Sequence, residues 1–260
     1  ADGVTGLTAT ITSSGVQTIN ATNLSTNTVW NGTSTLGLDT VSGIYGINGT
    51  KFNDTLTGNE QDNRLVGGGG NDTLNGGLGF DTVRTLWSGG VPYAGITVDL
   101  AAGTMTSTAE STGTDILRSI EAVQGSNLDD RFVATGFGAQ SINAGSSGTR
   151  NEFEGLAGND TIVGNGDTWL RYTNSQGSVT VDLSQGYAQG DYSVGRDTFT
   201  GVNGVYGSYV SDLLIGSAGA DFLYAMDGND VLRGGDGDDT LSGGAGNDSI
   251  DGGGGTNDKA

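Results

Sequence analysis

The feature that most constrains this chain is a nine-residue period in which glycine, aspartate and one apolar residue recur at fixed positions. Clear copies are GGDGDDTLS, which begins at Gly234, and GGAGNDSID, which begins at Gly243. Aspartate stands at position six and an apolar residue at position eight. A disordered acidic linker is the alternative, but a linker has no reason to keep an apolar residue two places after each aspartate. A fixed period of this kind predicts a solenoid of stacked repeats.

The repeats form three arrays, and a longer period lies above the nine. Segments that begin at Asp39, Asp115 and Asp197 align without a gap, which places their starts 76 and 82 residues apart (39 to 115, 115 to 197). Each aligned segment leads into an array, so the chain holds about three copies of one module. We therefore expect an N-terminal β segment (1–48), a first array (49–84), a connecting β segment (85–124), a degenerate middle array (125–167), a second connecting β segment (168–206) and a C-terminal array (207–260).

The composition excludes several classes of function. Asp and Glu number 30 against 10 Lys and Arg, a formal net charge of −20, which argues against nucleic acids and anionic membranes as partners. The chain has no Cys and no His, which excludes disulfides, structural zinc sites, cysteine nucleophiles and histidine-dependent triads. No window approaches 18 apolar residues, so we expect no membrane span. Most of the acids are Asp, the shorter carboxylate, which favours turns or metal coordination.

Two repeats are expected to form one coil of strand, loop, strand and loop. Residues 18 apart then lie above one another in parallel strands, which would stack carboxylates about 4.8 Å apart. Like charges at that spacing repel unless a cation lies between them. The loops offer only oxygen ligands, which suit Ca²⁺ with its 6–8 oxygens better than Mg²⁺ and leave soft metals without ligands. Because one apolar residue per strand makes a thin core, we expect the arrays to fold when Ca²⁺ binds.

The pattern G-G-x-G-x-D-x-apolar-x resembles the nonapeptide of the RTX (repeats-in-toxin, hemolysin-type calcium-binding) family. The match is complete at 67–75, 76–84, 234–242 and 243–251. The resemblance implies an all-β fold: a right-handed parallel β-roll, or β-helix, of stacked nonapeptide turns with wider irregular β segments between arrays. It also implies export by type I secretion, folding outside the cell, and a fragment of a larger bacterial secreted protein.

By the same resemblance, the calcium ligands are the position-six side chains and the carbonyl groups of loop glycines. About two ions are expected in the first array, about four in the last, and about six to eight overall. Asn63 and Asn257 lack the charge and are expected to bind weakly or to act as end caps. The implied side chains are Asp54, Asn63, Asp72, Asp81, Asp130, Asp160, Asp212, Asp221, Asp230, Asp239 and Asp248, and the implied glycines are Gly67, Gly70, Gly76, Gly79, Gly216, Gly219, Gly234, Gly237, Gly243 and Gly246.

Other acidic residues have less specific interpretations. Asp39, Asp115 and Asp197 begin the aligned segments, and we expect them to cap turns or strand ends rather than bind metal. Asp99 and Asp182 lie in alternating strands, where a solvated strand face is the simpler interpretation.

The biological role remains open between two hypotheses. One is a calcium-dependent structural segment of a secreted adhesin or surface-layer protein. The other is an accessory module that helps an attached enzyme, such as a protease, lipase or polysaccharide-modifying enzyme, to fold or to bind polysaccharide. Trp87, Trp169 and Tyr172 suggest sugar binding, but aromatic cover for the ends or wider parts of a thin solenoid is favoured. The periodic Asp residues single out no catalytic pair, so we expect no enzyme activity in this chain.

Overall fold

The computed structural model describes residues 7–10, 17–21, 38–41, 45–49, 53–85, 94–107, 113–145 and 148–260. The chain divides into two compact units. Unit 1 comprises Ala1–Gln124 and Gly136–Thr149, and unit 2 comprises Gly125–Thr135 and Arg150–Ala260. Throughout the described residues the regular elements are β-strands, which confirms the all-β prediction.

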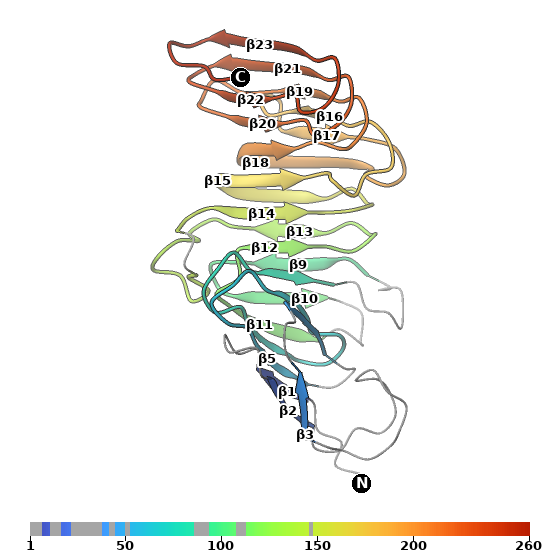
Figure 1. The fold of residues 1–260 in the computed structure, drawn as a ribbon, viewed down its shortest axis with the longest axis vertical. Coiled ribbons are helices and arrows are strands. Elements are labelled where there is room, and N and C mark those ends of the chain that lie inside the picture. Colours follow the sequence, from blue (N-terminus) through green and yellow to red (C-terminus); the bar gives the residue numbers. More distant parts are fainter. Residues whose placement is uncertain are drawn as a thin grey trace. The chain divides into compact units, whose positions relative to one another are not determined.

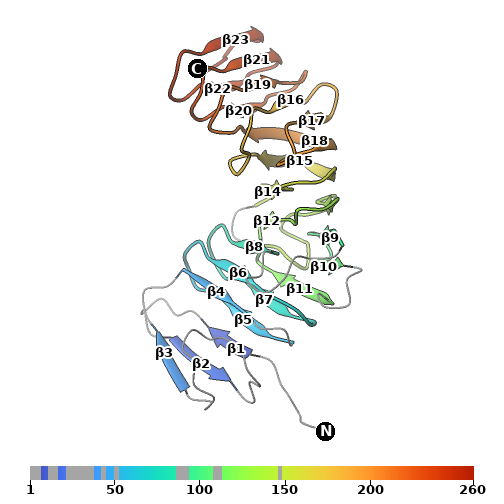
Figure 2. The ribbon, with the colours of Figure 1, turned by 90° about the vertical axis from the view of Figure 1, so that its right-hand side faces the viewer.

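The strands of unit 1 are short, since each repeat has only three residues between its loops. Figure 2 shows β4, β6 and β8 of this unit side by side in one row, and β5 beside β7 in another. The strands are β1 (Leu7–Thr10), β2 (Gln17–Ala21), β3 (Leu38–Val41), β4 (Gly46–Asn48), β5 (Thr55–Thr57), β6 (Arg64–Val66), β7 (Thr73–Asn75), β8 (Thr82–Arg84), β9 (Ile96–Asp99), β10 (Thr104–Ser107), β11 (Thr114–Arg118) and β12 (Ala122–Gln124).

Unit 2 contains two longer strands, β15 and β18, as well as the last array. Figure 1 shows β18 to β23 stacked towards the C-terminus. The strands are β13 (Arg131–Val133), β14 (Asn151–Glu154), β15 (Thr161–Arg171), β16 (Thr180–Asp182), β17 (Tyr187–Gln189), β18 (Arg196–Tyr206), β19 (Leu213–Ile215), β20 (Phe222–Tyr224), β21 (Val231–Asp236), β22 (Thr240–Ser242) and β23 (Ser249–Gly254).

Parallel strands pair at a spacing of 18 residues within the arrays, as the nine-residue period predicts. Strand β5 pairs with β7 so that Leu56 lies opposite Leu74, and β19 pairs with β21 so that Leu214 lies opposite Leu232. Consecutive repeats therefore alternate between the two sides of a coil. This register confirms the predicted parallel β-roll.

The core of each unit is a pair of columns built from position eight. In unit 1, Leu56, Leu74 and Leu117 form one column and are fully buried. In unit 2, Leu214 and Leu232 are also fully buried, whereas Ile250 in β23 is 40% exposed. Strand β23 pairs with β21 alone among the described strands, so one side of Ile250 lacks a covering coil.

The connecting segments differ from the rest of the roll because they are antiparallel. Strands β1, β2 and β3 form one antiparallel meander, β9, β10 and β11 a second, and β16, β17 and β18 a third. The alternating pattern of these segments predicts strands but not their direction. In the third meander only residues 183–186 and 190–195 separate successive strands, which suits antiparallel pairing, because a parallel pair needs a long crossover.

Glycine has two separate roles in the loops. In the repeat that begins at Gly234, Gly235 and Gly237 have φ values of 102° and 113°, so positions two and four use the left-handed region. The glycine at position one, Gly234, does not use the left-handed region. A Cβ on Gly234 would collide with the Oδ2 atom of Asp239 in the same repeat. Position one is therefore glycine because the carboxylate at position six occupies the space of a side chain.

Candidate calcium-binding edges

The position-six residues stack into columns along the edges of each unit, which we call buried ladders. In each ladder a backbone N–H donates to a carboxylate oxygen of the next coil. The Asp54 N–H donates to Asp72 Oδ1 at 2.8 Å, and the Asp221 N–H donates to Asp239 Oδ1 at 2.9 Å. The ladders are Asp54–Asp72–Asp115 and Asn63–Asp81–Glu121 in unit 1, and Asp130–Asp160–Asp197, Asp212–Asp230–Asp248 and Asp221–Asp239–Asp258 in unit 2.

The second oxygen of many ladder carboxylates is buried without a hydrogen-bond partner. In the described part of the chain the ion pairs join Arg150 and Arg171 to Glu152, which lies outside the ladders. Among the described residues, these ion pairs therefore do not reach the carboxylates whose second oxygen is unpartnered. The unpartnered oxygens are Oδ2 of Asp72, Asp81, Asp160, Asp230 and Asp239, together with Oε1 of Glu121.

Burial raises the pKa of the carboxyls of Asp72, Asp81 and Asp160. Burial, and next the charge of Asp115, raises the pKa of Asp72 to about 8. Burial, and next the charge of Asp197, raises the pKa of Asp160 to about 9. Burial likewise raises the pKa of Asp81 to about 7. A cation beside these oxygens would reverse the shift, so the donor set fits a hard divalent ion such as Ca²⁺.

The glycine carbonyl groups predicted as calcium ligands lie in the same loops as the carboxylates. The carbonyl oxygens of Gly67, Gly76 and Gly234 each lie against the position-one glycine of the preceding coil. The described residues contain no group of three or more acidic side chains placed to hold a metal. Each ladder spaces its carboxylates one coil apart, so a bound cation would take other oxygens from the backbone. The remaining predicted glycines, Gly70, Gly79, Gly216, Gly219, Gly237, Gly243 and Gly246, lie in the same loops.

The structure corrects the interpretation of two acidic residues. Asp115 and Asp197 were expected to cap turns, but each accepts a hydrogen bond from the adjacent coil, from the N–H of Asp72 and of Asp160. Asp197 also accepts a hydrogen bond from the buried Tyr172 hydroxyl at 3.0 Å. The side chain of Asp39 lies outside the described residues, as does Trp87.

The end of the last ladder also differs from the prediction. Asp258, not Asn257, accepts the hydrogen bond from Asp239 N–H, at 3.1 Å. The offset is 19 residues instead of 18 (239 to 258), so the last repeat holds one extra residue. Asn257 instead donates through its backbone N–H to Asp238 at position five.

A second, exposed ladder runs along position five and was not predicted. The Asn71 N–H donates to Asn53 Oδ1 at 2.8 Å, and the Asn247 N–H donates to Asn229 Oδ1 at 2.9 Å. Here the later coil donates to the earlier one, the reverse of the buried ladder. The recurring Asn-Asp pair at positions five and six is the signal that would have revealed it.

One edge of unit 2 has uncharged residues where a ladder would be. Thr168 donates through its hydroxyl to Asn151 Oδ1 at 2.9 Å, and the Asn151 amide donates to Asn165 Oδ1 at 3.1 Å. These groups satisfy one another without an ion. The middle of the roll therefore combines the Asp130 ladder with an edge joined by uncharged side chains.

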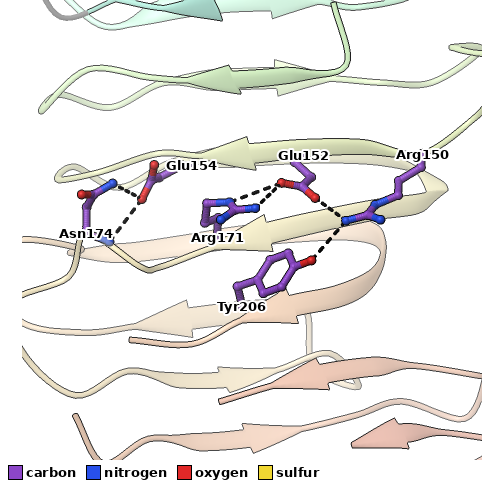
Figure 3. A network of polar contacts seen from close by, with 6 residues as sticks. All are labelled: Arg150, Glu152, Glu154, Arg171, Asn174 and Tyr206. Atoms are coloured by element: carbon purple, nitrogen blue, oxygen red, sulfur yellow. Dashed lines mark hydrogen bonds and ion pairs between the residues drawn. The ribbon is translucent and has the colours of Figure 1, made fainter. Parts of the chain in front are cut away.

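Nearby, side chains on the outer face of β14, β15 and β18 form a closed network. Glu152 accepts from Arg150 and Arg171, and Arg150 also donates to the Tyr206 hydroxyl at 3.2 Å (Figure 3). The Arg150 guanidinium lies over the Trp169 ring, 4.0 Å from its centroid. Trp169 is consequently only 6% exposed, in agreement with a covering role for this aromatic.

These observations define the class of the protein: a parallel β-roll whose loop edges carry buried carboxylates suited to calcium. The chain carries the RTX calcium-binding nonapeptide repeat of the hemolysin type, which matches four times, at residues 48–83, 147–168, 206–241 and 224–258. The RTX repeat suspected from the sequence is thus confirmed in these segments of the chain. Among curated proteins no relative matches the chain. The matched family model describes a calcium-binding repeat.

Proposed function

We propose that this chain is a calcium-triggered folding region of a secreted or cell-surface bacterial protein, with a structural or adhesive role. The observation that carries the proposal is the set of buried carboxylate oxygens without a partner. Asp72, Asp160 and Asp239 each have one oxygen bound by a backbone N–H and the other unpartnered, and each is 1% exposed.

Such oxygens oppose folding when no cation is present. A buried, unpaired charge costs several kcal/mol of folding free energy. Without a cation, the carboxyl group avoids this cost by taking up a proton. Bound Ca²⁺ supplies the missing charge between coils. Ca²⁺ is abundant outside cells and scarce inside them, so the same residues would keep the arrays unfolded before export and fold them afterwards.

The proposed ligands are the ladder aspartates and the carbonyl oxygens of the loop glycines. By this assignment Asp115, Asp197 and Asp258 join the position-six residues predicted from the sequence. Asn63 contributes an amide oxygen to its ladder but no charge, so we expect the weakest binding beside it. We retain the expectation of about six to eight ions bound between position-six residues of successive coils.

Circular dichroism tests the proposal directly. The chain should show a coil spectrum in EGTA and a β-sheet spectrum with a few millimolar Ca²⁺, whereas Mg²⁺ at the same concentration should have little effect. Isothermal titration calorimetry would count the ions. Identical spectra in EGTA and Ca²⁺ would refute the proposal.

The alternative role is an accessory module for an attached enzyme or for polysaccharide binding. Among the described residues, the aromatic cluster formed by Trp169, Tyr206, Phe222 and Tyr224 is the natural candidate for stacking on a sugar. Arg150 and Arg171 cover two of its rings, which favours a structural role. Calcium-dependent binding to a glycan array would favour the alternative.

Among the described residues, a search for a long apolar helix that could span a membrane finds none.

A further inference from the structure

The turn between β11 and β12 in unit 1 is a shortened form of the repeat loop. Three residues, 119–121, connect these strands, whereas six residues, 76–81, connect β7 and β8 in the coil beneath. The register is nevertheless kept, because Leu117 lies opposite Leu74 and Val123 opposite Val83. Glu121 therefore occupies the position-six place in its ladder, although its sequence does not match the nonapeptide.

Glu121 is bound in the same way as a position-six aspartate. Its Oε2 atom accepts the Asp81 N–H at 2.8 Å, and its Oε1 atom has no hydrogen-bond partner. Oε1 lies against Gly145, where a Cβ would collide with it. Gly145 thus takes the place of the position-one glycine, although it lies 24 residues downstream (121 to 145). The longer glutamate side chain compensates for the missing loop residues.

The loop that carries Gly145 is tied to the short turn. The Asn143 side chain accepts the Ile120 N–H at 3.0 Å and donates to the Ile120 carbonyl at 2.8 Å. Asn143 is fully buried, so this pair fixes Gly145 beside Glu121. The downstream loop therefore completes an edge that the short turn alone leaves open.

We propose that Asp81 and Glu121 hold a further Ca²⁺ ion, at a site that the nonapeptide pattern does not specify. Both side chains are at least 99% buried, and Oδ2 of Asp81 and Oε1 of Glu121 are unpartnered. The Ser119 carbonyl oxygen lies beside Gly76 together with Asp81 Oδ2, which adds a backbone ligand. Two carboxylates and a carbonyl suit calcium. The inference rests on the proposed calcium-dependent folding.

The equivalent positions in the other two modules lack the carboxylate. Counting six residues from the aligned aspartates gives Tyr45 in the first module and Asn203 in the third. Tyr45 is 63% exposed and Asn203 is uncharged. The site is accordingly specific to the middle module, where it would hold the shortened turn and the loop at Gly145 together.

Isothermal titration calorimetry on the full chain tests the site. Glu121→Gln should bind one ion fewer than the wild type while its circular dichroism in saturating Ca²⁺ is unchanged. Glu121→Asp should lose the same ion, because its side chain is one methylene too short for the three-residue turn. Glu60→Gln is the matched control, since Glu60 is an exposed glutamate of the same unit, and it should bind the full number.

Two outcomes would separate this inference from the proposed function. If the wild type folds with Ca²⁺ but Glu121→Gln binds the same number of ions, the site is overturned and the proposed function stands. If the wild type neither binds nor folds, both fail. Should Glu121→Gln not fold, wild-type crystals grown with Ca²⁺ decide: an anomalous calcium peak touching a Glu121 oxygen supports the site, and its absence while other ladders are occupied overturns it.

Discussion

The substitution Asp160→Asn should have opposite effects on stability with and without calcium. The Asp160 carboxyl is 1% exposed, accepts the Asp130 N–H through Oδ1 and has no partner at Oδ2. Without Ca²⁺ the folded chain must keep this carboxyl protonated at neutral pH, since its pKa is raised to about 9 from 3.8. With Ca²⁺ bound, the negative charge of Asp160 instead stabilises the folded chain, and asparagine lacks this charge.

The magnitude follows from the pKa difference. Protonation costs about 1.4 kcal/mol for each pH unit above the unfolded pKa, which gives an upper bound of about 5 kcal/mol at pH 7.5. Asparagine avoids this cost but buries an unsatisfied amide, at about 1–3 kcal/mol. Asn63 shows that the ladder accepts asparagine, because its Nδ2 is also unpartnered and its N–H still donates to Asp81. We therefore expect a net gain of about 2–4 kcal/mol without calcium.

The assay is circular dichroism under two conditions. In EGTA with a stabilising osmolyte, Asp160→Asn should fold at a lower osmolyte concentration than the wild type. In a calcium titration it should fold at a higher Ca²⁺ concentration. Asp251→Asn, which removes an exposed aspartate outside the ladders, should shift neither curve. A variant that is destabilised, or unaffected, under both conditions would refute the argument.

Three further predictions concern pH, loop packing and the aromatic cluster. Without calcium, the circular dichroism spectrum should show more β-structure as the pH falls from about 9 to about 6. Burial raises the pKa of Asp72 in the folded chain to about 8, so the stability that comes from its protonation is complete below the unfolded pKa and is lost as the pH rises through the folded pKa. A pH-independent spectrum would contradict this prediction. Gly234→Ala should lower the calcium-bound stability by about 1–3 kcal/mol in urea unfolding, because its Cβ meets the Asp239 carboxylate. Gly219→Ala should change stability by less than about 0.5 kcal/mol, because its Cβ would make only an ordinary contact with Ser217 Oγ at 3.8 Å. Trp169→Ala should cost about 3–5 kcal/mol in the same assay, and a near-neutral result would show that the cluster does not stabilise the roll.

The nine-residue period was sufficient to predict the architecture. It placed Leu56 opposite Leu74 and Leu214 opposite Leu232, because position eight has a single inward side chain and the coil has two repeats. The edges on which Asp72 and Asp81 lie followed from the same spacing of 18.

The sequence could not reveal features that depend on the register between unlike segments. Glu121 enters a ladder only because a three-residue turn replaces a six-residue loop, and Asp115 enters one because β11 pairs with β7. Gly145 reaches its place from a different part of the chain. Such contacts are set by tertiary packing, so a local pattern cannot predict them.

The alternation of repeats between two sides of a coil limits how this chain can change in length. Deleting one nonapeptide would transfer every downstream loop to the opposite edge and break each ladder at that point, because the hydrogen bonds join residues 18 apart. Deleting two would remove a whole coil and rejoin the ladders in register. The unit in which such a roll can be lengthened, shortened or engineered is therefore the pair of repeats, except where a shortened turn resets the phase.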